Sequence, residues 1–174
     1  FVFPAVSMES EAFWIVQSAP VRIGNFLWIK FFFYYIPLMM MAEGLVVASN
    51  ILLNVSDFMM LLSVLTVFFL VPAIVGLATG LGAIYADFKS ENPANIVTGF
   101  GGLLFMILSF GLIALVIILE AGPVYTIFMA DVLGKNLTAL KILWAVLSFA
   151  LAIFLCLLAT FYPIHLGRKR LTVK

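Results

Sequence analysis

Long apolar runs separated by short polar breaks form the main pattern along this chain. Each run is long enough to cross the ~30 Å hydrocarbon core of a bilayer as a helix, at 1.5 Å per residue. The pattern therefore predicts an all-α fold, a polytopic transmembrane helix bundle of about four spans. The spans are expected at about residues 31–55, 58–86, 96–119 and 142–166.

The polar breaks between these runs predict the connections. Residues 54–57 form a short turn, and residues 87–95 form a polar break in which Pro93 favours the start of a helix. Residues 120–141 contain acidic residues, glycines and a proline among moderately apolar stretches. We expect an external loop there, with a short interfacial helix around residues 124–133.

The segment before the first span has a different pattern. Ser7 is a candidate N-cap, and Glu9 and Glu11 follow where the helix dipole favours acids. Apolar residues then recur at helical spacing as far as Pro20, which is expected to end the helix. The pattern predicts an amphipathic interfacial helix. We accordingly divide the chain into residues 1–30, a cytoplasmic interfacial segment, and residues 31–174, the transmembrane domain.

Composition supports a bilayer environment for the whole chain. Of its 174 residues, 66% are hydrophobic and only 10% are charged, too few polar residues to cover a soluble globule. Four spans use nearly the whole length, so no room is left for a soluble catalytic domain. Cys156, the only cysteine, cannot form an internal disulfide or a metal cluster. The chain begins with Phe1, and we expect a fragment of a longer protein.

The basic residues indicate an orientation, because cytoplasmic flanks of membrane spans are enriched in Lys and Arg. With the C-terminus in the cytoplasm, only Lys135 and Lys141 lie on the far side. Both termini are therefore predicted to be cytoplasmic. The basic residues then inside are Arg22, Lys30, Lys89, Arg168, Lys169, Arg170 and Lys174.

Three stretches of this chain are similar to bacterial ABC exporter permeases. Residues 6–20 resemble the linker that precedes a Lys at the membrane entry in such permeases. The shared features are a Ser, acidic residues, a Phe-Trp pair and a Pro. Residues 87–93 resemble the Glu-Asn loop that leads into a Gly-rich helix. Residues 162–171 resemble the end of such chains. The resemblance covers most of the 174 residues as the C-terminal part of a longer permease of the bacterial inner membrane.

This resemblance implies roles for both polar segments. The connecting helix, with Glu9, Phe13, Trp14 and Pro20, would lie beside a cytoplasmic ATP-binding subunit. The 87–93 loop would dock in that subunit and couple it to the membrane helices. The alternatives are a membrane-surface element and a plain turn between spans. The implied coupling residues are Asp87, Phe88, Lys89, Glu91, Asn92 and Pro93.

Glu43 is the one charged residue inside the first predicted span, near the bilayer centre. Intramembrane acids usually face a bundle interior or an aqueous cavity, because an ionised carboxylate is costly in hydrocarbon. We therefore expect Glu43 in the translocation path or facing a partner subunit. A structural hydrogen bond between helices is the alternative.

Enzyme motifs are not found in the sequence. No phosphate-binding loop ending in Gly-Lys-Ser/Thr is present, and no residues have metal-ligand spacing, so neither a cofactor nor a metal is expected. The expected function is transport as an exporter permease segment, with lipid, an ATPase subunit and further permease spans or a second copy as partners. An intramembrane enzyme using Glu43 and a structural assembly subunit remain as alternatives. No nucleic-acid partner is expected.

Overall fold

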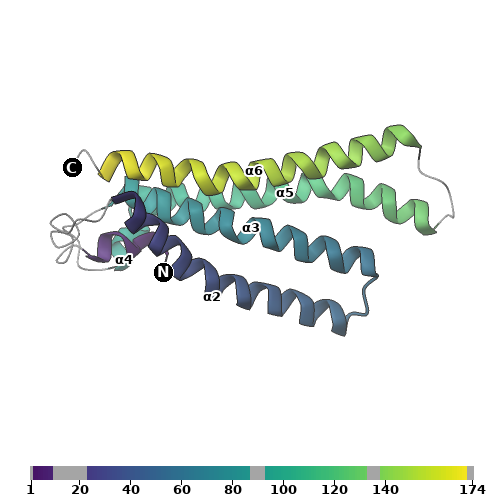
Figure 1. Cartoon of the computed structure of the whole chain (residues 1–174), viewed down its shortest axis with the longest axis horizontal. Helices are drawn as coiled ribbons and strands as arrows, with labels where there is room; N and C mark the ends of the chain where they lie inside the picture. The colour runs from purple at the N-terminus through teal and green to yellow at the C-terminus, as the bar shows by residue number, and fades with distance from the viewer. Residues whose placement is uncertain (1, 10–22, 87–92, 133–137, 172–174) are drawn as a thin grey trace.

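The structure is a computed structural model that describes residues 2–9, 23–86, 93–132 and 138–171 (Figure 1). Every element in these ranges is a helix, so the predicted all-α class is confirmed. Four of the helices are long and apolar enough to cross a membrane. The elements are η1 (Phe3–Ala5), η2 (Ser7–Glu9), α2 (Ile23–Leu52), α3 (Asp57–Ile84), α4 (Pro93–Thr98), α5 (Phe100–Val132) and α6 (Ala139–Leu171).

The first two long helices form a hairpin. The Ser56 hydroxyl caps α3 by accepting a hydrogen bond from the Met59 backbone N–H, and Asp57 lies in the first turn, where the helix dipole favours an acid. Asn54 has a φ of 48°, a left-handed conformation that Asn adopts more readily than most residues. α2 starts at Ile23, earlier than residue 31, because no polar break separates the entry residues from the span.

The largest difference from the expected bounds is at the end of α5. The chain stays helical to Val132, whereas a loop was expected from residue 120, with a short helix around residues 124–133. Two contacts explain the continuation. The Glu120 carboxylate accepts a hydrogen bond from Thr66 of α3, and Gly122 lies against the Trp144 ring of α6. Pro123 is accommodated inside the helix.

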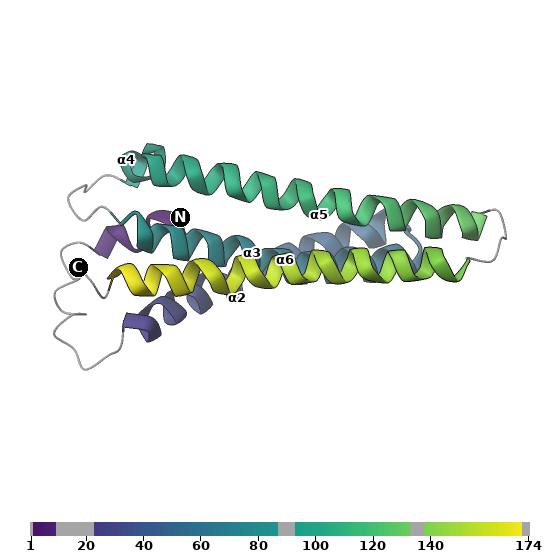
Figure 2. The ribbon, with the colours of Figure 1, turned by 90° about the horizontal axis from the view of Figure 1, so that it is seen from above.

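α3 lies at the centre of the bundle and contacts α2, α5 and α6. Figures 1 and 2 show that the α2–α3 turn, the end of α5 and the start of α6 lie at one end of the bundle. At the opposite end lie η1, α4, the start of α2, the end of α3 and the end of α6. We call this second end the α4 end.

Small residues bring α3 and α6 into close contact. A Cβ added at Gly76 would lie 2.7 Å from the Thr160 Cα and carbonyl oxygen. Gly80 lies in the same way against the Pro163 backbone, and Gly167 of α6 lies against Ala83 and Gly80. Close approach through small residues is the usual basis of helix association in membranes. The glycines at positions 76 and 80 therefore serve packing between α3 and α6.

The N-terminal segment packs against the α4 end. Phe3 stacks on Phe105 of α5 with ring centroids 5.6 Å apart, and its backbone carbonyl lies over Gly82 of α3. Ser7 lies in η2 with a buried side chain, not at the exposed start of an α-helix. The remainder of the expected interfacial helix lies outside the described residues. The described part is two short 3₁₀ turns.

Candidate functional site

Most residues of the two implied coupling segments lie outside the described part of the chain. These are Phe13, Trp14 and Pro20 of the connecting helix and Asp87, Phe88, Lys89, Glu91 and Asn92 of the loop. Glu9 is the last residue of η2, and Pro93 is the first residue of α4, as its preference for a helix start predicts. The roles implied for these residues stay predictions.

The described residues that flank these segments gather at the α4 end. η1 contacts both α3 and α4, and Ile96 of α4 shares an apolar cluster with Phe3 and Leu81. Arg168, Lys169 and Arg170 form the last turn of α6 at this same end (Figure 1). Cations there complement the negative end of the helix dipole. One end of the bundle thus combines the basic tail with the flanks of both polar segments.

Lys30 joins the N-terminal segment to the first long helix. Its ammonium donates a hydrogen bond to the Ala5 carbonyl, and it lies 5.2 Å from the centroid of the Phe26 ring. A cation over an aromatic face is stabilised by the ring quadrupole. Lys30 therefore ties η1 to α2.

Glu43 lies in α2 with both carboxylate oxygens buried. Within the described ranges, neither oxygen has a hydrogen-bond partner. The structural alternative for Glu43, a hydrogen bond between helices, is therefore not made by any described residue. A buried carboxyl without a partner is unfavourable, so this position favours contact with a polar group from outside the described residues.

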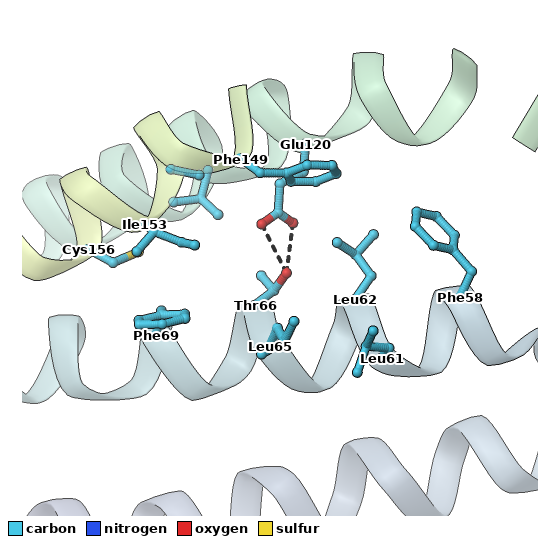
Figure 3. A pocket seen from close by; sticks show the side chains of 12 residues that line it. Phe58, Leu61, Leu62, Leu65, Thr66, Phe69, Glu120, Phe149, Ile153 and Cys156 are labelled. Atoms are coloured by element: carbon cyan, nitrogen blue, oxygen red, sulfur yellow. Dashed lines mark hydrogen bonds between the residues drawn. The ribbon is translucent and has the colours of Figure 1, made fainter. Parts of the chain in front are cut away.

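A second acidic residue lies in a cavity between α3, α5 and α6 (Figure 3). The Thr66 hydroxyl is 2.9 Å from each oxygen of Glu120 and donates to this carboxylate. The cavity holds about 260 Å³, and its other lining residues are apolar apart from the Cys156 thiol. Phe58 and Phe69 of α3 and Phe149 of α6 contribute aromatic rings to its wall.

The sequence pattern does not indicate this site, because it predicts a loop at Glu120. The signal available was the apolar run that resumes after Pro123, which is long enough to extend the span. Thr66, its hydrogen-bonding partner, gave no signal at all, because a lone Thr in an apolar helix commonly bonds to its own backbone.

A larger and more apolar cavity lies nearer the α4 end. It holds about 620 Å³ between α3, α5 and α6, and Leu77, Leu112 and Leu158 are among its lining residues. Tyr162 supplies the only side-chain hydroxyl in its lining. A wall of this kind accommodates hydrocarbon, with the Tyr162 hydroxyl as its one polar side-chain group among the described residues.

The chain matches one family along nearly its whole length. Residues 1–173 match the model of the family described as "Putative ATP-binding cassette". No curated protein and no solved structure matches the chain. The family description names the ATP-binding side of such systems, while the match runs through all four long apolar helices. This membrane-helix bundle therefore belongs to the ATP-binding-cassette family of that description.

Proposed function

We propose that this chain is a membrane-spanning permease part of an ATP-binding-cassette exporter, driven by a separate cytoplasmic ATPase subunit. The family match supports an ATP-binding-cassette system, and the four long apolar helices support its membrane side. The 174 residues contain no Gly-Lys-Ser/Thr phosphate loop. ATP hydrolysis is therefore assigned to the partner, and the chain itself is not an enzyme in this proposal.

The observation that carries the proposal is the grouping at the α4 end. η2 and the start of α2 flank segment 10–22, and the end of α3 and α4 flank segment 87–92; these described flanks lie at the same end of the bundle as the basic turn of α6. A single cytoplasmic partner can reach both segments from this side. The positive-inside rule favours the cytoplasm for this end, because Arg168, Lys169 and Arg170 lie there.

Packing explains how a displacement at this end would enter the membrane. α3 precedes segment 87–92 and is in backbone contact with α6 through Gly76 and Gly80. Rigid-body movement of packed elements is one of the established kinds of conformational transition. A force on this segment would therefore shift α3 together with α6. The same force would reach α5 through α4, which follows the segment. The inner membrane of a bacterium, with both termini cytoplasmic, is the location this proposal implies.

Glu43 belongs to the proposed path. Its carboxyl is buried in a span without a hydrogen-bond partner in the described ranges. A cation or donor from a second permease copy, or from further spans, would meet this need. The enzyme alternative is not favoured, because no described group hydrogen-bonds to Glu43 and could activate it.

The test is photo-crosslinking from a benzoylphenylalanine placed at Asn92, in native membranes with and without ATP. We expect capture of a subunit that carries a phosphate-binding loop, with a yield that changes with ATP. The matched control is the same probe at Thr138, just before α6 at the opposite end of the bundle. Capture from Thr138 and not from Asn92 would place the ATPase on the wrong side and overturn the proposal.

A further inference from the structure

The cavity around Glu120 combines one carboxylate with three phenyl rings. Glu120 projects from α5 toward Thr66 on α3, and Phe149 of α6 lies beside it (Figure 3). Phe58 and Phe69 of α3 complete the aromatic part of the lining. The rest of the wall is aliphatic apart from Cys156. The cavity therefore offers a single negative group in a hydrocarbon surrounding.

None of the described residues that line the cavity is basic. The only hydrogen bond found for Glu120 among the described residues comes from Thr66. One hydroxyl proton is shared by two carboxylate oxygens, each 2.9 Å away, so accepting positions on both oxygens remain available. A carboxylate in apolar surroundings is unfavourable without a compensating cation.

The wall also determines which kind of cation fits. Inorganic divalent cations need several oxygen ligands, and only Glu120 and Thr66 supply side-chain oxygen here. An organic cation needs one counter-charge and apolar contacts. The face of a phenyl ring attracts such a cation through the ring quadrupole, and carboxylate and ring then act together. A volume of about 260 Å³ suits a substituted ammonium with a single ring or a short chain.

We propose that this cavity binds a lipophilic organic cation, with its ammonium group at the Glu120 carboxylate and its hydrocarbon part against Phe58, Phe69 and Phe149. The inference rests on the proposed function in one respect: the cation is the transported cargo only if the chain belongs to an exporter. Binding itself requires neither ATP nor the ATPase subunit. The cavity lies between α3, α5 and α6, the helices that a displacement at the α4 end is proposed to shift.

Phenyltrimethylammonium and its neutral carbon isostere, tert-butylbenzene, provide the direct test. The two have nearly the same shape and differ in charge, so the comparison isolates the role of the carboxylate. Titration calorimetry on the purified chain in micelles, corrected with empty micelles, should show saturable binding of the cation. We expect the isostere to bind about tenfold more weakly, because it lacks the positive charge that the carboxylate and the ring faces attract.

Two variants in the cavity, each with a matched control, test whether the cation binds there. Glu120→Gln should remove the preference for the cation, whereas Asp57→Asn, which removes the same charge from the exposed start of α3, should keep it. Phe149→Leu should weaken cation binding severalfold, and Phe154→Leu, at an exposed ring of the same helix outside the cavity, should not. Circular dichroism confirms that each variant is folded.

Three results would overturn the site. These are equal affinity for both probes, no saturable binding of the cation to the folded wild-type chain, or an unchanged preference in folded Glu120→Gln. The wild-type comparison decides the matter even where a variant fails to fold. The exporter proposal fails separately, because the Asn92 crosslink measures contact with the ATPase and not ligand binding.

Discussion

Gly76 of α3 lies against the backbone of Thr160 in α6, with no space for a side chain between them. A Cβ added at Gly76 would lie 2.7 Å from the Thr160 Cα and from its carbonyl oxygen. Such a distance requires the two helices to separate. The close approach of α3 and α6 at this point therefore requires glycine at position 76.

Gly76→Ala should destabilise the bundle by about 1–3 kcal/mol, the usual cost of overpacking. Gly44→Ala in α2 is the matched control, because nothing lies within 4 Å of a Cβ there. Alanine is the better helix former, so the control should be neutral or stabilising by up to about 1 kcal/mol. Unfolding in mixed micelles measures the change in stability for each of the two variants. Effects of the same sign and size at the two positions would contradict the close contact.

The Thr66–Glu120 hydrogen bond should hold α3 to α5. Thr66→Val removes the donor and keeps the shape, and we expect a loss of about 0.6 kcal/mol and at most about 1.7 kcal/mol, the average and the maximum for interhelical hydrogen bonds in membranes. Thr126→Val is the control, because the Thr126 hydroxyl donates to the Pro123 carbonyl within its own helix. Unfolding of the two variants, with a double-mutant cycle including Glu120→Gln, measures the coupling. A coupling energy of zero would show that the bond does not join the helices.

Lys30 should determine how tightly the N-terminal segment is held. Lys30→Met keeps the apolar stem and removes the ammonium that donates to the Ala5 carbonyl. Hydrogen exchange of the amides at residues 5–8 should then become faster, because the segment loses its polar tie to α2. Lys141→Met, at an exposed position near the opposite end, should leave these amides unchanged. Unchanged exchange in the Lys30 variant would show that other contacts, such as those of Phe3 and Val6, hold the segment.

Glu43 is expected to lower the stability of the isolated chain and to support transport in the assembled system. Replacing it by Leu removes a buried carboxyl that has no hydrogen-bond partner in the described ranges, so the isolated chain should become more stable by about 1–3 kcal/mol. If Glu43 meets a partner subunit or the transported molecule, the same variant should lower ATP hydrolysis coupled to transport in the assembled system. Thermal unfolding and coupled ATPase assays measure the two effects. A less stable chain with full coupled activity would assign Glu43 to packing.

Ser148 gives a further test of the α5–α6 contact. Its hydroxyl donates to the Leu119 carbonyl of α5 at 2.6 Å, next to Glu120. Ser148→Ala should cost about 0.6 kcal/mol, the average for such bonds. Ser109→Ala is the matched control, because the Ser109 hydroxyl donates to Phe105 within the same helix. A loss no greater than that of the control would show that this bond adds nothing between the helices.

The start of α3 and the end of α5 show where sequence reasoning succeeded and where it failed. Ser56 and Asp57 act locally, so the polar turn before the second span lay within two residues of its expected place. Glu120, Gly122 and Pro123 resemble a helix end by the same local rules, yet α5 continues through them. Thr66 and Trp144, the residues that make this possible, are far away in sequence.

The sequence by itself determined that this chain is a bundle of about four membrane helices, with glycines available for close packing and a basic tail. Transfer of a segment into hydrocarbon is a sum over its own residues, so hydropathy suffices for that result. Only the tertiary structure decided which glycine meets Thr160, that Glu120 faces a cavity, and that Glu43 meets no described donor. These features depend on how the helices rotate and cross. Rotation and crossing are set by packing between residues that are far apart in sequence, and a hydropathy sum over one segment does not describe such packing.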